Sequence, residues 1–197
     1  KRFGRSARVC NAGSGGYGGA SQFSSREAQC PEQTIMVDNV FPWRRGNALA
    51  LLIDGPQFYV QMLARITAAG RQVDLELYLV ESGVCSSALL DALCSAAQRG
   101  VVVRCLFDDF GAQRLSAADR QRLQAAGVQV QYYNPVRWKH GLRNFHRDHR
   151  KLLLVDEQFA YVGGTGATDE FWQPEHTSSR WHEVMVEISG PLVADWQ

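Results

Sequence analysis

The order of apolar and polar residues predicts that strands and helices alternate between residues 48 and 133. Short runs of β-branched and apolar residues indicate strands, and stretches in which apolar residues recur every three or four positions indicate helices. Three of these helices are followed by glycines that are suited to end them, Gly70, Gly100 and Gly127. The expected strands cover residues 48–53, 73–80, 101–107 and 128–132.

Local signals mark where the expected helices begin. Asp54-Gly55-Pro56 opens the first helix, because proline fits the first helical turn. Ser86 or Ser87 is suited to cap the second helix, and Ser116 with Asp119 has the capping-box pattern for the third. The resulting β-α-β-α-β-α-β series predicts an α/β fold, with a mainly parallel or mixed β-sheet sandwiched by helices.

The two ends of the chain lie outside this series. Residues 1–40 are rich in Gly, Ser and Arg and offer little apolar surface to bury, so we expect a flexible arm. Residues 41–197 form the expected folded lobe, with a further strand at 183–189 and the start of a helix after Gly190-Pro191. Too few residues follow for that helix to be stable alone, so we interpret the lobe as truncated at its C-terminus.

Composition narrows the possibilities only slightly. The 197 residues, 45% of them hydrophobic, are enough for one domain with a full core. The formal net charge is +1, so no overall imbalance indicates a polyanionic partner. The five cysteines contain no C-x-x-C pair, which favours a reduced, cytoplasmic protein without a metal site. No apolar run reaches the roughly 18–20 residues of a membrane-spanning helix.

The most informative segment has the pattern H-x-K-x4-D followed by two glycines, formed by His149, Lys151, Asp156 and Gly163-Gly164. His149 and Lys151 are two positions apart, so on an extended strand their side chains point to the same face. An imidazole and an ammonium group held side by side can attack a phosphodiester while neutralising its non-bridging oxygens. Chance alone predicts roughly 0.004 occurrences of the three-residue pattern in a chain of this composition.

This pattern resembles the HKD motif of the phospholipase D superfamily, and a resemblance to bacterial cardiolipin synthases extends over residues 41–197. Several further segments carry the resemblance in collinear order. They are Trp43–Asn47, Leu51–Gly55, Glu76–Tyr78, Ala96–Val101, Ala125–Val128, Asp169–Phe171, Trp181–Glu183 and Gly190-Pro191.

The resemblance implies an enzyme without metal or other cofactor, in which two HKD motifs meet between two similar lobes. One motif histidine forms a phosphohistidine with the substrate, and the other protonates the leaving alcohol. His149 would take one of these two places, Lys151 would hold the phosphoryl oxygens, and Asp156 would support the local loop. Glu183 matches the position of a carboxylate that hydrogen-bonds the catalytic histidine and fixes its tautomer.

One departure from the family concerns the turn after the two glycines, which usually reads G-[GS]-x-N. This chain has Gly166 at the position of the Asn, whose side chain contacts phosphate in the family. We expect the backbone N–H groups of Gly164, Thr165 and Gly166, or the hydroxyl of Thr165 or Thr168, to replace that contact.

The expected function is therefore that of one lobe of a cardiolipin-synthase-type phosphatidyltransferase. Its partner would be an anionic, phosphatidylglycerol-like phospholipid, and the protein would be peripheral at the inner membrane. The sequence contains one such motif, so a second HKD lobe would come from the same longer chain or from a homodimer mate. Two alternatives stay open: a single-motif homodimeric phosphodiesterase or nuclease, whose partner would be nucleic acid, and a catalytically incomplete binding lobe.

A basic cluster precedes the motif and has two interpretations. It favours an anionic surface, such as phospholipid headgroups or nucleic acid, but it is also typical of an ordinary charged loop. Trp138 and Phe145 lie within it and would either insert at a membrane interface or pack on the domain. The basic residues are Arg137, Lys139, His140, Arg143 and Arg147.

Overall fold

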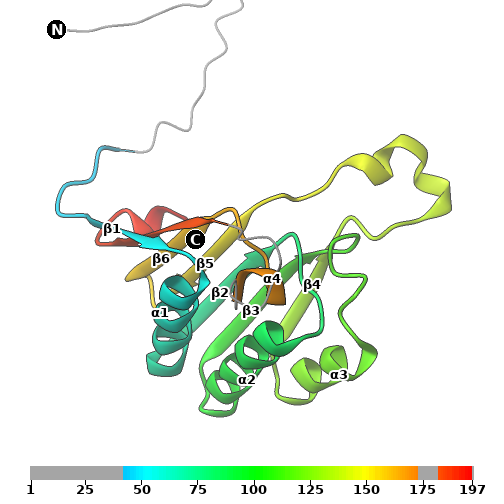
Figure 1. Cartoon of the computed structure of the whole chain (residues 1–197), viewed down its shortest axis with the longest axis horizontal. Helices are drawn as coiled ribbons and strands as arrows, with labels where there is room; N and C mark the ends of the chain where they lie inside the picture. Colours follow the sequence, from blue (N-terminus) through cyan, green and yellow to red (C-terminus); the bar gives the residue numbers. More distant parts are fainter. Residues whose placement is uncertain (1–41, 173–181, 197) are drawn as a thin grey trace, which may run out of the picture. The chain divides into compact units, whose positions relative to one another are not determined.

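A computed structural model describes residues 42–172 and 182–196, and the expected arm at residues 1–40 lies outside the described residues. The described part of the chain contains one mixed β-sheet of seven strands in the order β1-β7-β6-β5-β2-β3-β4 (Figure 1). An α/β fold with a mixed sheet is thus confirmed. Strands and helices alternate up to β4, as the apolar pattern predicted, whereas β5 and β6 follow one another without a helix between them.

The five strands predicted at residues 48–53, 73–80, 101–107, 128–132 and 183–189 are present, with bounds that agree to within three residues. The strands are β1 (Ala48–Ile53), β2 (Gln72–Leu77), β3 (Val102–Asp108), β4 (Gln129–Tyr133), β5 (Lys151–Val155), β6 (Phe159–Gly163) and β7 (Val184–Ser189). The helices are α1 (Gly55–Ala68), α2 (Val84–Gln98), α3 (Ala117–Ala125) and α4 (Asp169–Trp172), with 3-10 helices η1 (Trp138–Phe145) and η3 (Val193–Trp196).

The sheet is less parallel than the alternating series suggested. Only the pairs β2–β3 and β3–β4 are parallel, and the other four pairs are antiparallel. The first strand does not join β2. It pairs instead with β7 at the other edge, from Ala48 opposite Ser189 to Ile53 opposite Val184. A mainly parallel sheet is therefore wrong for this chain, and the mixed alternative is right.

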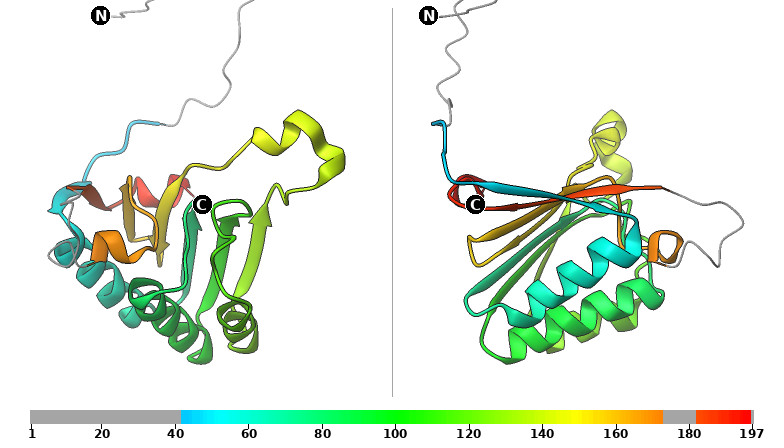
Figure 2. Two further views of the ribbon diagram at one scale, coloured as in Figure 1. Left: turned by 45° about the vertical axis from the view of Figure 1, so that its right-hand side comes forward. Right: turned by 60° about the vertical axis from the view of Figure 1, so that its left-hand side comes forward.

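The four helices α1–α4 cover one face of the sheet (Figure 2). The alternating residues Val73, Leu75 and Leu77 of β2 point to that side and join the main core. On the opposite face only η3 packs against the sheet among the described residues, where Val193 contacts a second, smaller apolar cluster with Leu154. The second helical layer of the expected sandwich is therefore not part of the described structure.

The second helix starts earlier than its serines predicted. Its first residue is Val84, and Ser86 lies inside the first turn, where its Oγ accepts a hydrogen bond from the N–H of Gly83 at 2.8 Å. The carboxylate of Asp169 accepts hydrogen bonds from the N–H groups of Val84 and Cys85 at 3.1 and 2.7 Å. Because the capping carboxylate is distant in sequence, the local pattern could not reveal it. The predicted cap of α3 is confirmed, since Ser116 Oγ accepts the N–H of Asp119.

The cysteines and the helices of the described residues can be compared with the expectations from composition. Cys85, Cys94 and Cys105 are buried and carry free thiols, while Cys10 and Cys30 lie outside the described residues. None of the helices in the ranges 42–172 and 182–196 combines the length and the hydropathy of a bilayer-spanning segment.

Candidate active site

His149 and Lys151 lie in contact at the start of β5. The ammonium nitrogen Nζ of Lys151 is 2.8 Å from His149 Nδ1, and it donates a second hydrogen bond to the carbonyl oxygen of His149 at 2.9 Å. His149 is exposed, whereas Lys151 is only 8% exposed. The chain thus presents an accessible imidazole with a nearly buried cation directly beside it.

The place of β5 in the sheet explains why Lys151 is buried. The strand lies between β2 and β6, with Lys151 opposite Leu77, and Leu153 and Val155 continue the same core-facing row. Burial lowers the pKa of Lys151, because the ammonium group loses hydration, while the carboxylates of Glu183 and Asp148 oppose this shift. An ammonium group with so little water around it gains strongly from an anionic partner, which a phosphate group would supply.

Tyr78, the residue after β2, contacts both groups. Its ring centroid is 4.6 Å from that of His149, and Lys151 Nζ lies 5.3 Å from the centroid of the Tyr78 ring. The ring can therefore restrict rotation of the imidazole and attract the ammonium group through its π face. In the sequence Tyr78 is no more than a part of the family resemblance, because its proximity to the motif depends on the pairing of β2 with β5.

A buried carboxylate fixes the backbone just before the motif. Asp108, at the end of β3, is 1% exposed, and its Oδ2 accepts a hydrogen bond from the N–H of Asp148 at 2.9 Å. Its Oδ1 accepts the N–H groups of Phe110 and Gly111 at 3.0 and 3.1 Å. The same side chain that caps its own loop therefore holds the chain next to the motif histidine. The position of Asp108 at a strand end gave no sign of this second contact.

Arg150 lies between the two motif residues in sequence and pairs with two carboxylates. Its Nε is 3.2 Å from Glu76 Oε1 and 3.1 Å from Asp148 Oδ1. Burial, a hydrogen bond with Asp148 and the negative charge of Asp148 raise the pKa of Glu76 to about 7, and Arg150 opposes this rise. Burial alone would raise the pKa of Asp148 too, but hydrogen bonds with Glu76 and Arg150 lower it. Of the two carboxyl groups, Glu76 therefore has the raised pKa and Asp148 has the lowered one.

Glu183 lies against Gly164. A Cβ atom added at Gly164 would come within 2.7 Å of Glu183 Oε2, so the absence of a side chain there makes room for the carboxylate. The backbone of Glu183 is anchored by Asp54, whose N–H donates to Glu183 O at 2.9 Å and whose Oδ1 accepts the Glu183 N–H at 3.1 Å. Within the described residues no hydrogen bond joins Glu183 to His149, and the carboxylate acts on Lys151 through its charge.

The turn after β6 does not bring the expected hydroxyl groups to the site. Thr165 is buried, and its Oγ1 lies 3.1 Å from the hydroxyl of Tyr59 in the core. Thr168 is 4% exposed, and its hydroxyl has no hydrogen-bond partner among the described residues. A Cβ atom at Gly166 would lie 2.3 Å from the carbonyl oxygen of Leu79. This backbone therefore has no room for the asparagine that the family usually has at that position.

Asp156 lies at the far end of β5 from the motif histidine and lysine. Asp156, Glu157 and Gln158 connect β5 to β6, and the first two have φ of 54° and 57°. The carboxylate accepts hydrogen bonds from the N–H groups of Gly70, Arg71 and Gln72 at 2.9, 2.8 and 2.9 Å. Burial would raise the pKa of Asp156, but these three donors outweigh it and lower the pKa. The contacts of Asp156 are those of local support.

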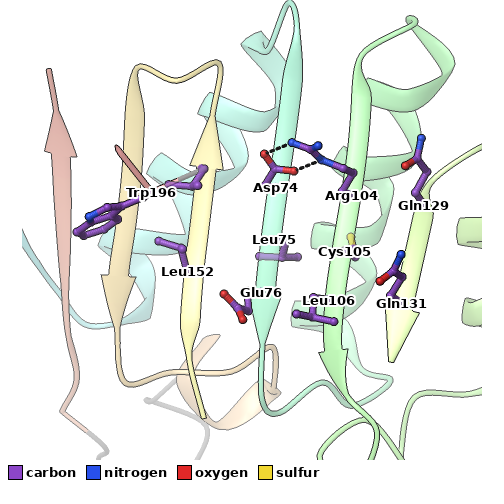
Figure 3. Close-up of a pocket in the computed structure, with 11 residues that line it drawn as sticks. Asp74, Leu75, Glu76, Arg104, Cys105, Leu106, Gln129, Gln131, Leu152 and Trp196 are labelled. Atoms are coloured by element: carbon purple, nitrogen blue, oxygen red, sulfur yellow. Dashed lines mark hydrogen bonds and ion pairs between the residues drawn. The ribbon is translucent and has the colours of Figure 1, made fainter. Parts of the chain in front are cut away.

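A cavity of about 570 Å³ opens beside His149 and Lys151 and is also lined by Leu152, Val162 and Trp196. A second hollow, of about 340 Å³, lies on the helix-free face, where Arg104 bonds Asp74 at 2.5 and 2.9 Å (Figure 3). His149 and Lys151 do not line this second hollow, so the cavity of about 570 Å³ beside them is the candidate active site. No group of three His, Cys, Asp or Glu side chains suited to a metal ion occurs in the described ranges.

Comparison with known proteins gives a match to one family over most of the lobe. The family model described as cardiolipin synthase, PLD-like domain, matches residues 62–196. Cardiolipin synthase B of Salmonella typhimurium is 36% identical over 155 residues, which cover 78% of this chain and 37% of that protein. Cardiolipin synthase B of Escherichia coli is 35% identical over 159 residues, with the same coverage of both. The chain thus spans 37% of the length of these relatives.

Solved structures share the fold at low sequence identity. The phospholipase D family member Nuc from Salmonella typhimurium superposes with a TM-score of 0.57 at 18% identity, covering 77% of this chain and 89% of that one. Phosphatidylserine synthase of Haemophilus influenzae gives a TM-score of 0.59 at 16% identity, covering 75% and 34%. At these identities the likeness concerns the fold alone.

Proposed function

The chain belongs to the family of cardiolipin synthase phospholipase D-like domains, and from this premise we propose that it is one lobe of a cardiolipin-synthase-type phosphatidyltransferase. The reaction would transfer a phosphatidyl group from one phosphatidylglycerol molecule to another and release glycerol. The observation that carries the proposal is the contact of His149 with Lys151, 2.8 Å apart at the accessible end of a buried strand. A rigid strand end of this kind holds a reactive pair in fixed geometry.

The proposed reaction has two steps at one phosphorus atom. A motif histidine attacks phosphorus, so an N–P bond forms while the P–O bond to glycerol breaks, and the second motif histidine gives its proton to the leaving oxygen. The hydroxyl of the acceptor lipid then attacks the same phosphorus. The N–P bond breaks, and the second histidine takes the hydroxyl proton. We assign His149 to one of these two places.

Lys151 would exchange partners when the substrate binds. For Nε2 of His149 to attack phosphorus, the ring proton must be on Nδ1, the nitrogen that Lys151 contacts in this structure. We propose that the ammonium group moves from Nδ1 to the non-bridging phosphoryl oxygens, where it offsets their charge. The carboxylate of Glu183 would then accept the Nδ1–H hydrogen bond. Asp156 supports this site only indirectly, because its three hydrogen bonds fix the other end of β5.

The phosphate group would be held by backbone donors more than by hydroxyl groups. We keep the N–H groups of Gly164, Thr165 and Gly166 as the proposed phosphate-binding donors. The Thr165 hydroxyl lies against Tyr59 in the core, and the Thr168 hydroxyl is buried. The proposed donor and acceptor are bilayer lipids, so we also propose that the enzyme works as a peripheral protein at the inner membrane. The reaction itself requires no metal or other cofactor in this scheme.

The second motif would come from another lobe of the same longer protein. The chain spans 37% of its cardiolipin synthase relatives, which leaves room for a second lobe in proteins of that length. The alternative is a second copy of this chain. Excess inactive His149→Ala protein distinguishes the two, because exchange of subunits would lower wild-type activity if two copies shared one site. Activity that is independent of the added variant would support a single chain.

Product analysis of the full-length protein tests the proposal. Incubation with phosphatidylglycerol vesicles should give cardiolipin and glycerol in equal amounts, detected by mass spectrometry. His149→Ala should lower turnover by about a thousandfold or more, as loss of a nucleophile or of its partner acid does. His146→Ala is the matched control, because this exposed histidine lies three residues away, and it should retain turnover. Full transfer activity in His149→Ala would refute the catalytic assignment, and DNA cleavage in place of lipid transfer would favour the nuclease alternative.

A further inference from the structure

The segment between β4 and β5 projects away from the sheet (Figure 1), and several of its large apolar side chains are exposed. We call residues 135–146 the η1 arm, after the 3-10 helix that it contains. Trp138 is 87% exposed, Leu142 is 82% exposed and Phe145 is 79% exposed. Large apolar residues exposed singly are common on soluble proteins, but three on one short projection form a patch that needs an explanation.

The charges of the η1 arm all have one sign. Arg137, Lys139 and Arg143 alternate with the apolar residues, and the sequence has no Asp or Glu from position 135 to position 147. The ammonium group of Lys139 lies 5.5 Å from the ring centroid of Trp138, so cation and aromatic side chain are presented together. This combination of basic and apolar side chains fits an anionic surface that also accepts apolar groups.

The η1 arm is a built structure with defined hydrogen bonds at its base. Asn134 Nδ2 donates to the carbonyl oxygens of Arg143 and His146 at 2.7 and 2.8 Å. Asn144 bridges the arm, since its Nδ2 donates to Arg137 O at 2.8 Å and its Oδ1 accepts the Arg137 N–H at 3.1 Å. These contacts hold the two legs of the arm together. The apolar tips therefore point outward from a fixed base.

We propose that the η1 arm inserts its apolar side chains among the headgroups of an anionic phospholipid bilayer and so brings the bilayer surface to the candidate active site. Phe145 is only four residues before His149 in the sequence, so the inserted arm would lie next to the accessible imidazole. The link to catalysis rests on the proposed function, since it takes the substrate from the same bilayer. Binding of the arm to the bilayer is a separate property and can be measured without turnover.

The side chains of the arm favour lipid over nucleic acid. Tryptophan and phenylalanine could stack on bases, but a leucine that is 82% exposed has neither a π face nor a hydrogen-bonding group for a base or a phosphate. In a bilayer interface all three side chains lose water, while the arginines and the lysine stay near anionic headgroups. A bilayer therefore accounts for the three apolar side chains and for the basic residues between them.

Vesicle sedimentation of the full-length protein tests the arm, with vesicles of phosphatidylcholine alone and of phosphatidylcholine mixed with phosphatidylglycerol. Trp138→Ser with Leu142→Ser should weaken binding to the mixed vesicles by about tenfold or more, since two apolar anchors are lost. Arg137→Gln with Lys139→Gln should reduce the preference for the anionic vesicles. Val60→Ser with Val84→Ser is the matched control, because these valines are 58% and 60% exposed on α1 and α2, and it should bind as the wild type does.

Three outcomes separate the hypotheses. Unchanged vesicle binding in Trp138→Ser with Leu142→Ser would overturn the proposal. It would also be overturned if the wild type bound DNA but not vesicles, and this double variant lost the DNA binding. His149→Ala should bind vesicles as the wild type does, whatever its turnover. If the wild type bound vesicles through the η1 arm but transferred no lipid, the proposed function would be contradicted. The η1 arm would still be a bilayer contact.

Discussion

At the scale of single residues, the motif aspartate differs from the motif histidine and lysine in what its side chain does. Asp156 is held by three backbone donors at the β5–β6 turn, and its pKa is lowered by them. A half-buried carboxylate in this place stabilises the fold, because it accepts hydrogen bonds from three backbone N–H groups. The effect of its removal should therefore be seen in stability before it is seen in chemistry.

Asp156→Ala should lower the free energy of unfolding by about 2–3 kcal/mol, because three N–H groups lose a charged acceptor and a residue at positive φ is replaced. Urea denaturation measures this loss. Glu157→Gln is the control: it removes the ion pair with Arg71, whose side chain is 61% exposed, and should cost less than about 1 kcal/mol. Because the folded pKa of Asp156 is lowered, its contribution is present above the unfolded pKa and is lost as pH falls through the folded pKa.

Glu76 should give the opposite pH dependence. Its pKa is raised to about 7, so its contribution to stability is present below the unfolded value, roughly 4.3, and is lost as pH rises through the folded pKa. Glu76→Gln keeps the shape of the protonated side chain and cannot titrate. Between roughly pH 5 and roughly pH 8, the wild type should lose about 1–2 kcal/mol relative to the variant. Parallel stability curves for the two proteins across that range would contradict the raised pKa of Glu76.

At the scale of elements, the strands and helices of the first half of the lobe could be predicted from the local sequence pattern. The order of the strands in the sheet could not. Strand and helix lengths from β1 to β4 follow from residues close in sequence. The position of β1 at the edge beside β7 depends on the pairing of residues as distant as Ala48 and Ser189. The start of α2 depends on its contact with Asp169. Such contacts join residues far apart, so neither periodicity nor capping signals could reveal them.

In the candidate site, too, contacts between residues close in sequence could be predicted, and contacts between distant residues could not. The spacing of His149 and Lys151 was sufficient to predict their proximity, because an extended chain places residues two apart on one side. Tyr78 and Asp108 reach the motif only through the neighbouring strands β2 and β3. The inward direction of Thr165 was equally hidden, since it depends on the Tyr59 hydroxyl in α1. Whether these residues act in catalysis stays a prediction.

The turn between β6 and α4 gives a prediction at this scale. Gly166→Asn restores the residue that the family usually has, yet its Cβ atom would lie 2.3 Å from Leu79 O. The turn and the segment after β2 would have to separate, so we expect a loss of about 3 kcal/mol or more in stability. Gly100→Asn is the control, because a Cβ atom there meets nothing within 4 Å, and it should cost about 1 kcal/mol. Thermal unfolding that ranks the two variants in the reverse order would show that the turn is compliant.

At the scale of the whole lobe, the two edges of the sheet differ in character. In β1 the alternating residues Leu49, Leu51 and Ile53 are 70%, 69% and 53% exposed. They lie in register with Ile188, Val186 and Val184 of β7, on the side of the second apolar cluster. The β4 edge carries Gln129 and Gln131 at the hollow on the same face of the sheet (Figure 3). The described lobe therefore has one apolar edge and one polar edge.

An exposed apolar edge strand is a site of association. Leu49→Thr with Leu51→Thr should therefore lower the concentration-dependent light scattering of this chain several-fold, while its free energy of unfolding changes by less than about 1 kcal/mol, because both side chains are already exposed. Val60→Thr with Val84→Thr removes exposed apolar groups from the helical side and should leave scattering unchanged. Equal scattering in the β1 variant and the wild type would mean that this edge is protected in solution, and a large loss of stability would mean that another part of the protein covers it.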